Sequence, residues 1–186
     1  MLKTSILGRT GLEVTNLGFG AMELKGVVED GGRLPNEEHA GVVLNAVLDS
    51  GINFIDTSWC YDRSEEFIGR FVSHRRDEYV LATKCGHWWR NDPDHSGWSH
   101  EGMMNSINQS LERLKTDHVD ILQLHNATPD DVRTHDSINT LKEIQAQGKT
   151  RFIGISTVLP YIEEFMEMGI FDTFQIPYSA MEPEHE

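Results

Sequence analysis

Long apolar runs are missing from this chain of 186 residues. No stretch approaches the roughly 18 apolar residues of a membrane-spanning helix. The N-terminal segment MLKTSILGRT is too short and too polar for the apolar core of a secretion signal. These absences predict a cytoplasmic protein that does not act on a membrane. With 38% hydrophobic and 25% charged residues, the chain has the composition of an ordinary globular protein.

Cysteine and positive charge are also scarce. The two cysteines, Cys60 and Cys85, are too few for a disulfide framework and lack the spacing of metal ligands, so we expect reduced thiols. A redox switch between them would require their Cβ atoms to converge, which the sequence does not indicate. Lys and Arg number 16 against 30 Asp and Glu, a formal net charge of −14. Because binding to phosphate backbones depends on clustered Lys and Arg, this balance disfavours nucleic acid as a partner.

Apolar segments of strand length alternate with segments of helical period along the chain. The first segment, TSILGRTGLEV, is typical of a hairpin that turns at Arg9, Thr10 and Gly11. Strands are then expected within NLGFG, NFIDT, YVLATK, VDILQL, RFIGIS and FDTFQIP. These strands are rich in Val, Ile, Leu and Phe with little alternation, which is typical of parallel strands that helices cover.

Helices are expected between these strands. Their predicted ranges are 35–50, 64–72, 99–115, 130–147 and 161–169. In the first helix we expect one apolar face made of Val42, Val43, Ala46, Val47 and Leu48. The fourth helix is expected to run unbroken from about Asp130 to Gln147.

A parallel sheet with helices leaves two architectures, an α/β barrel and a doubly wound open sheet. The Rossmann form of the open sheet needs G-x-G-x-x-G between its first strand and helix, but this chain has GFGAMELKG there. The sequence therefore predicts an α/β fold of the TIM (β/α)8 barrel type with an N-terminal β-hairpin. Such a barrel has eight βα units. We expect about six of them in a single domain over residues 1–186, as the truncated N-terminal portion of a longer enzyme.

Titratable side chains are concentrated at the predicted strand ends, where parallel barrels place their reactive groups. The Asp56 carboxylate beside the Lys84 ammonium would keep both groups charged in a partly buried site. We expect the Lys84 cation, next to the Tyr61 hydroxyl, to lower the phenol pKa from its usual value of about 10. Tyr61 would then act as a general acid towards a carbonyl oxygen, which His125 would orient. Such a site suits carbonyl reduction by hydride from a cofactor, because no side chain carries a hydride.

Six motifs occur in a fixed order: LGRTGLEVTNLGFGAM, IDTSWCYDRSEEFIGRF, LATKCG, VDILQLHNA, FIGIS and FQIPYS. Together they resemble an aldo-keto reductase. The resemblance implies NADPH, or less often NADH, as the cofactor and a small-molecule aldehyde or ketone as the substrate. It implies a catalytic tetrad of Asp56, Tyr61, Lys84 and His125. It also implies cofactor contacts from Gly20, Ala21, Met22, Asp56, Ser156, Thr157 and Gln175.

Two departures from the family pattern leave an alternative open. Ser156-Thr157 stands where the family usually has Ser-Asn, and a threonine hydroxyl cannot offer the separate carbonyl and amide groups of asparagine. The family's phosphate-binding loops follow strands seven and eight, beyond Glu186. The alternative is a non-catalytic scaffold of the same ancestry or an inactive fragment. A glycosidase is disfavoured, because Asp56 has no second strand-end carboxylate as a partner. The open edges of an incomplete barrel also predict self-association of the chain.

The segment CGHWWRNDPDHSGWSH, residues 85–100, concentrates tryptophan and histidine. An aromatic wall of the substrate site is one interpretation and plain packing is the other. The candidates for the wall are Trp88, Trp89 and Trp98. His87, His95 and His100 are eight and five positions apart. That spacing fits no compact metal motif, so we expect no metal site.

Overall fold

The computed structural model describes residues 2–24, 37–87 and 96–181. Its centre is a 6-stranded parallel sheet in which the strands pair in chain order. The strands are β3 (Phe19–Gly20), β4 (Phe54–Asp56), β5 (Val80–Cys85), β6 (Val119–His125), β7 (Thr150–Ser156) and β8 (Thr173–Gln175). Within the described residues, β3 and β8 each pair with one neighbour in this sheet. The arrangement confirms the predicted barrel type and comprises part of such a barrel.

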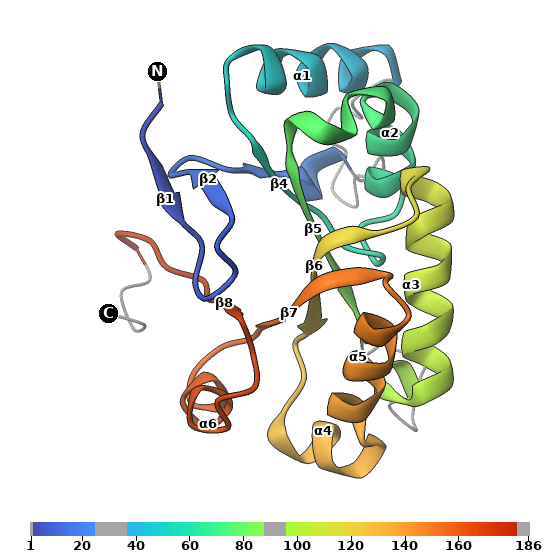
Figure 1. Ribbon diagram of the computed structural model, residues 1–186, viewed down its shortest axis with the longest axis vertical. Helices are drawn as coiled ribbons and strands as arrows, with labels where there is room; N and C mark the ends of the chain where they lie inside the picture. Colours follow the sequence, from blue (N-terminus) through green and yellow to red (C-terminus); the bar gives the residue numbers. More distant parts are fainter. Residues whose placement is uncertain (1, 25–36, 88–95, 182–186) are drawn as a thin grey trace.

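The N-terminal hairpin is confirmed as predicted. It consists of β1 (Thr4–Ile6) and β2 (Glu13–Thr15), which pair antiparallel. Gly8 in the turn has a φ of +51°, and a Cβ there would lie 2.3 Å from the Asp172 carbonyl oxygen, so this close approach requires glycine. The Arg9 guanidinium donates a hydrogen bond of 2.7 Å to the Phe171 carbonyl. These contacts hold the hairpin beside β8, as Figure 1 shows.

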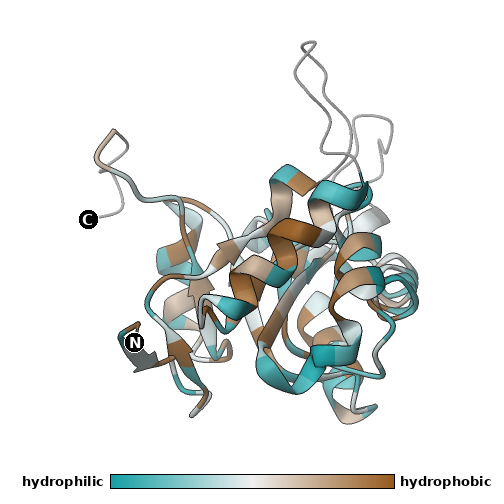
Figure 2. Cartoon of the chain, turned by 90° about the horizontal axis from the view of Figure 1, so that it is seen from above, coloured by the Kyte–Doolittle hydropathy of each residue, from teal (hydrophilic) through white to brown (hydrophobic). Residues whose placement is uncertain are grey.

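Most of the helices lie on the side of the sheet away from the hairpin (Figure 1). The α-helices are α1 (Glu37–Asp49), α2 (Ser64–Phe71), α3 (His100–Leu114), α4 (Pro129–His135), α5 (Ser137–Ala146) and α6 (Tyr161–Glu167). Short 3-10 turns are η1 (Ala21–Leu24), η2 (Ser73–Glu78) and η3 (Ser96–Trp98). Hydrophobic and hydrophilic segments both occur along the helices (Figure 2). No helix in the described ranges is both long and apolar enough to span a membrane.

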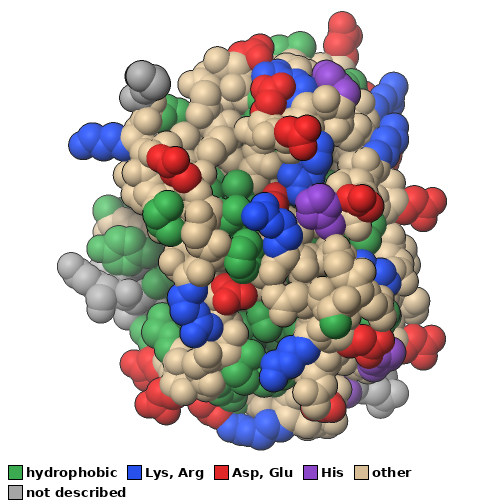
Figure 3. Space-filling model, viewed as in Figure 1, with side chains coloured by type: hydrophobic (Ala, Val, Ile, Leu, Met, Phe, Trp, Pro, Cys, Tyr) green, Lys and Arg blue, Asp and Glu red, His purple; other side chains and the backbone are tan. Residues whose placement is uncertain are grey.

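The core lies between the sheet and this helical layer. All seven residues of β6 are buried, which is the pattern expected for a strand covered on both faces. Large buried side chains that close the core include Phe67, Leu81, Met103, Ile107 and Phe165. On the face seen in Figure 3, hydrophobic side chains also reach the surface among charged ones.

The predicted apolar face of α1 is correct only at Leu48. Val42 is 62% exposed, and the buried residues are Ala40, Gly41, Leu44 and Leu48. A Cβ on Gly41 would lie 2.7 Å from the ring of Phe71, which belongs to α2. Close packing of α1 against α2 therefore requires glycine at position 41, whereas the prediction placed three valines on the buried face and omitted Leu44.

The predicted single helix over residues 130–147 is two helices. Asp136 lies in the left-handed region, with φ 52° and ψ 36°, and separates α4 from α5. Thr128 and Asp131 form a capping box that begins α4. Ser137 is buried and its hydroxyl donates a hydrogen bond of 2.9 Å to the Trp98 carbonyl, so α5 begins against η3. Apolar periodicity continues across Asp136 and does not reveal the break.

Candidate active site

Polar side chains gather at the carboxyl ends of the parallel strands. The register pairs Gly20 with Asp56, Lys84 with Gln123, His125 with Ser156, and Ser156 with Gln175. Because neighbouring parallel strands end at the same edge of a sheet, residues far apart in the sequence meet there. Two cavities on the sheet, of about 500 Å³ and about 270 Å³, reach the same edge. Both are lined by Leu7, Phe54, Asp56 and Gln175.

A buried ion pair lies at the centre of this edge. Lys84 Nζ is 2.6 Å from Asp56 Oδ2, and the side chains are 1% and 14% exposed. Lys84 Nζ also donates to the Thr57 carbonyl at 2.8 Å. Gln123 donates to Asp56 Oδ1 at 3.0 Å, and Gln175 donates to Asp56 Oδ2 at 3.2 Å. The Asp56 carboxylate thus accepts hydrogen bonds from three side chains, which compensates for its burial.

Tyr61 lies in the loop between β4 and α2. Its amide donates to the Ser58 carbonyl at 3.0 Å, and Asp62 follows with a φ of +46°, so the chain turns sharply here. Lys84 Nζ lies 4.9 Å from the centre of the Tyr61 ring. The Tyr61 and His125 rings are 6.0 Å apart and nearly perpendicular, at 84°. The loop therefore brings the phenol ring against both Lys84 and His125.

The expected lowering of the Tyr61 pKa is not what the structure shows. Burial, followed by the negative charge of Asp56, raises the pKa of the Tyr61 phenol above its usual value. The Lys84 ammonium, 4.9 Å from the ring centre and paired with Asp56 at 2.6 Å, does not reverse this shift. The Tyr61 hydroxyl is therefore protonated at neutral pH.

His125 ends β6 and is 7% exposed. Its Nδ1 is 3.4 Å from Cys60 Sγ and 3.5 Å from Ser58 Oγ. Burial, with the positive charge of Lys84, lowers the pKa of the imidazole to about 3, so the ring is neutral at pH 7. Trp98 Nε1 donates to the His125 carbonyl at 3.1 Å and fixes the backbone of this strand end.

Trp98, one of the candidates for an aromatic substrate wall, is 2% exposed, and its ring lies against Gly86. This burial favours plain packing, the other interpretation, and the indole supports the strand end that carries His125. Trp88 and Trp89, the other two residues of the predicted wall, lie outside the described residues.

Gly20, which ends β3, and the two residues after it differ in their exposure. Gly20 is exposed, and Met22 is 44% exposed. Ala21 is fully buried, and its carbonyl accepts a hydrogen bond of 2.8 Å from Ser64 Oγ. Ala21 therefore packs in the interior and contacts α2 through its backbone. Gly20 and Met22 are accessible to solvent.

The predicted carboxamide-binding residues lie at the ends of β7 and β8. Ser156 is half-buried, and Thr157 is 3% exposed. The Thr157 hydroxyl donates to the Ala127 carbonyl at 3.3 Å, so it is engaged within the protein. Gln175 Oε1 is buried and has no hydrogen-bond partner among the residues that the structure describes. An unsatisfied buried acceptor of this kind favours a ligand donor.

Sequence reasoning missed Gln123. It is 4% exposed and contacts Asp56 directly, as described above. A signal was available, because Gln123 interrupts the apolar run ILQL two positions before His125, and residues two apart point to the same face. Ser58, which also contacts His125, had no comparable signal.

The two described histidines after β5, His87 and His100, lie in different surroundings. His100 lies at the surface, 59% exposed, and its Nε2 is 3.0 Å from Glu143. His95 lies outside the described residues. His87 instead stacks on His125, with ring centres 4.8 Å apart and an angle of 25°. Both cysteines are free thiols, and Cys85 is buried.

Comparisons with known proteins agree on one family. A sequence model described as the Aldo/keto reductase family matches residues 16–186. The oxidoreductase YqkF of Bacillus subtilis, whose function is uncharacterized, is 32% identical, with 95% of this chain and 56% of YqkF aligned. L-galactose dehydrogenase of Arabidopsis thaliana is 37% identical, with 89% of this chain and 53% of the relative aligned. The holo form of aldo-keto reductase AKR11C1 from Bacillus halodurans superimposes with a TM-score of 0.79 at 31% identity, over 96% of this chain and 58% of that protein. The chain thus spans about half the length of the curated relatives it matches.

Proposed function

Because the chain belongs to the aldo/keto reductase family, we propose that its site reduces an aldehyde or ketone to an alcohol with hydride from NADPH, or from NADH. The observation that carries the proposal is the buried Lys84–Asp56 pair, which lies against the Tyr61 ring beside a neutral His125. A bound nicotinamide supplies the hydride, which no side chain can provide. The protein must then protonate and orient the carbonyl oxygen.

Tyr61 is the proton donor in this proposal. Negative charge develops on the carbonyl oxygen as the carbon is reduced, and the protonated phenol can donate to it. The phenolate that remains is stabilised by the Lys84 ammonium, which lies over the ring at 4.9 Å. Asp56 holds Lys84 in that position through the ion pair of 2.6 Å. The raised pKa of the resting phenol ensures that Tyr61 carries its proton when the substrate arrives.

His125 orients the same oxygen. Its Nδ1 faces Cys60 Sγ and Ser58 Oγ, two groups that can each donate a hydrogen. A neutral ring carries one proton, so a ring that accepts at Nδ1 has its hydrogen on Nε2. The Nε2–H group then donates a hydrogen bond to the carbonyl oxygen beside Tyr61.

Among the residues present, Gln175 is the best candidate to bind the carboxamide group of a nicotinamide. Gln175 directs its amide nitrogen to Asp56, which leaves its buried oxygen to accept from the carboxamide NH2 group. Thr157 contributes less to carboxamide binding, because its hydroxyl already donates a hydrogen bond to the Ala127 carbonyl. We expect Gln175→Ala to raise the KM for the cofactor while the rate at saturation changes less.

Deuteride transfer tests the reaction itself. This chain would be joined to the C-terminal portion of the Bacillus halodurans neighbour to complete the barrel, then incubated with 4-deuterated NADPH or NADH and a panel of aldehydes and ketones. The proposal expects an alcohol that carries deuterium at the former carbonyl carbon. A completed barrel that binds the dinucleotide, yet transfers no deuterium to any compound, would support the non-catalytic alternative.

We propose that the chain also binds a second copy of itself through the edges of its sheet. Strands β3 and β8 present one unpaired side each in the described structure, and Phe174 on β8 is 37% exposed. Unpaired edges with an apolar side chain promote pairing with another chain. Sedimentation of the 186-residue chain over a concentration series tests this. A monomer at every concentration would contradict it.

A further inference from the structure

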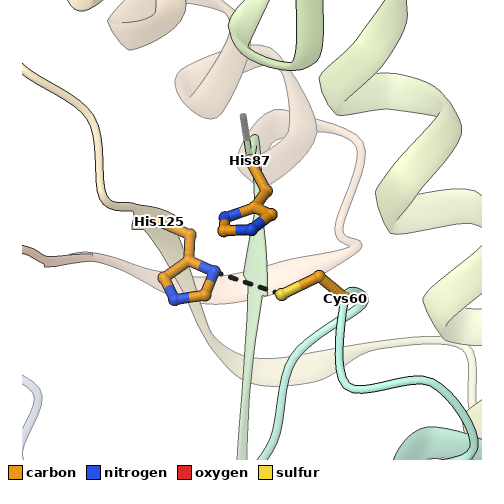
Figure 4. A group of neighbouring side chains, drawn as sticks. All are labelled: Cys60, His87 and His125. Carbon is orange, nitrogen blue, oxygen red and sulfur yellow. Dashed lines mark hydrogen bonds between the residues drawn. The ribbon is translucent and has the colours of Figure 1, made fainter. Parts of the chain in front are cut away.

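Three side chains with metal-binding atoms converge beside His125. Cys60, His87 and His125 each offer one such atom, and these atoms all lie within 4.8 Å of one another. They come from three segments, namely the loop after β4, the residues after β5 and the end of β6. Figure 4 shows His87 and Cys60 on the same side of the His125 ring.

The Cys60 and His125 atoms already have the spacing of two metal ligands. A tetrahedral zinc site has Zn–S distances of about 2.3 Å and Zn–N distances of about 2.0–2.1 Å, which separates sulfur from nitrogen by roughly 3.5 Å. The distance from Cys60 Sγ to His125 Nδ1 is 3.4 Å. One cation bound by both atoms therefore requires almost no change in their separation.

His87 requires a rotation. The lone pair of an imidazole nitrogen lies in the ring plane, and the His87 ring is stacked on His125 at 25°. Turning His87 about its side-chain bonds breaks this stack and directs a ring nitrogen towards the same point. Its position within 4.8 Å places that nitrogen in reach.

We propose that Cys60, His87 and His125 bind one soft divalent cation of the Zn²⁺ class, with the fourth position open to water or another ligand. One sulfur and two imidazole nitrogens suit zinc and disfavour Mg²⁺ and Ca²⁺, which prefer oxygen ligands. This proposal departs from the sequence expectation of no metal site. That expectation considered spacing along the chain, whereas these ligands meet only in the folded protein.

Binding exchanges one proton for the cation. The Cys60 thiol loses its proton to become a metal-bound thiolate, while the imidazoles bind through lone pairs that are free of protons at neutral pH. Burial lowers the pKa of both histidines and raises the pKa of the Cys60 thiol. The charge of Lys84 opposes the cation, and that of Glu65 favours it. We expect about one proton released per cation at neutral pH.

Cobalt is the probe for the test, because a Co²⁺–thiolate bond gives a charge-transfer band in the near ultraviolet. The 186-residue chain is titrated with Co²⁺, and Zn²⁺ and Mg²⁺ are then added as competitors. We expect one equivalent of Co²⁺ to saturate the band, Zn²⁺ to abolish it and Mg²⁺ to leave it unchanged. Cys60→Ser should remove the band. His87→Asn should weaken binding at least about tenfold, since even the loss of an outer-shell partner has an effect of that size.

Two matched controls distinguish this site from other thiols and histidines. Cys85→Ser removes the other thiol, and His100→Asn removes a surface histidine that is 59% exposed. Both should keep the band. No band in the unaltered chain, a band retained in Cys60→Ser, or equal weakening by His100→Asn and His87→Asn would overturn the proposal. None of these readouts depends on reductase activity.

A second measurement needs no variant. Cys60 is partly exposed and Cys85 is buried, so an alkylating reagent added to the folded chain should modify Cys60 first. Zn²⁺ at saturation should slow that modification, because the thiolate that would react is then a metal ligand. An unchanged rate of Cys60 alkylation in the presence of Zn²⁺ would contradict the site even if the variants failed to fold.

Discussion

Replacing Lys84 with methionine should destabilise the protein and should do so through Asp56. Methionine preserves most of the volume of the lysine side chain but removes its charge. The side chain is 1% exposed and bonded to Asp56, so the substitution leaves a carboxylate that is 14% exposed without its cation. The stability effect therefore reports on an uncompensated charge more than on lost packing.

The expected magnitude follows from the remaining contacts of Asp56. Removal of one partner from a buried ion pair costs about 3–5 kcal/mol. Asp56 keeps the hydrogen bonds from Gln123 and Gln175, and it retains some exposure to solvent. The cost should therefore lie at the lower end, at about 3 kcal/mol.

Urea unfolding of Lys84→Met, Asp56→Asn and the double variant measures this effect. The double variant no longer contains a buried charge, so its free energy of unfolding should exceed that of Lys84→Met alone. Tyr161→Phe is a control, because Tyr161 lies at the surface with 38% exposure. The reasoning would be refuted if Lys84→Met lowered the free energy of unfolding by less than about 1 kcal/mol. It would also be refuted if the double variant were less stable than both single variants.

Two further predictions concern packing and pH. At Gly69 in α2 an added Cβ would lie 1.9 Å from the Arg113 carbonyl oxygen of α3, so Gly69→Ala should cost at least about 1–3 kcal/mol in urea unfolding. Gly20→Ala meets nothing within 4 Å and should cost less; equal losses would contradict the packing account. Burial opposes ionisation of Asp120, but the Leu81 amide and the Arg76 and Arg151 guanidiniums outweigh it and hold the Asp120 pKa below its usual 3.8. A carboxyl pKa lowered by folding stabilises the protein above pH 3.8 and loses that contribution as pH falls through the folded value. Asp120→Asn should therefore destabilise the protein by about 3 kcal/mol near neutral pH, with the difference shrinking at lower pH; a difference that does not change with pH would exclude this cause.

The strand ends could be predicted from the sequence because two simple regularities apply there. Parallel strands buried on both faces appear as apolar runs, and the residue that ends each run, such as Asp56 or His125, lies at the shared edge. The hairpin turn could also be predicted, because glycine is typical of turns. In the structure Gly8 and Gly11 both have positive φ. Short-range rules are sufficient for these features.

Features that depend on neighbouring elements could not be predicted. The buried face of α1 is set by the ring of Phe71 in α2, and the break at Asp136 by a backbone conformation that apolar spacing does not encode. The direction of the Tyr61 pKa shift was predicted wrongly, because the sequence gives neither the burial of Tyr61 nor the effect of the Asp56 charge on it. Each error concerns a contact in three dimensions.

The rate of hydride transfer in a single turnover tests most directly whether Tyr61 supplies the proton. The barrel completed as described above is premixed with reduced cofactor, and the step is followed after addition of an aldehyde that it reduces. Tyr61→Phe should slow this step by about 100-fold or more, because general acid catalysis contributes at least that much, while the affinity for the cofactor stays nearly unchanged. Tyr161→Phe, the surface control, should keep the full rate. If Tyr61→Phe retained more than roughly a tenth of the rate, Tyr61 would not be the proton donor and the proposed mechanism would be wrong.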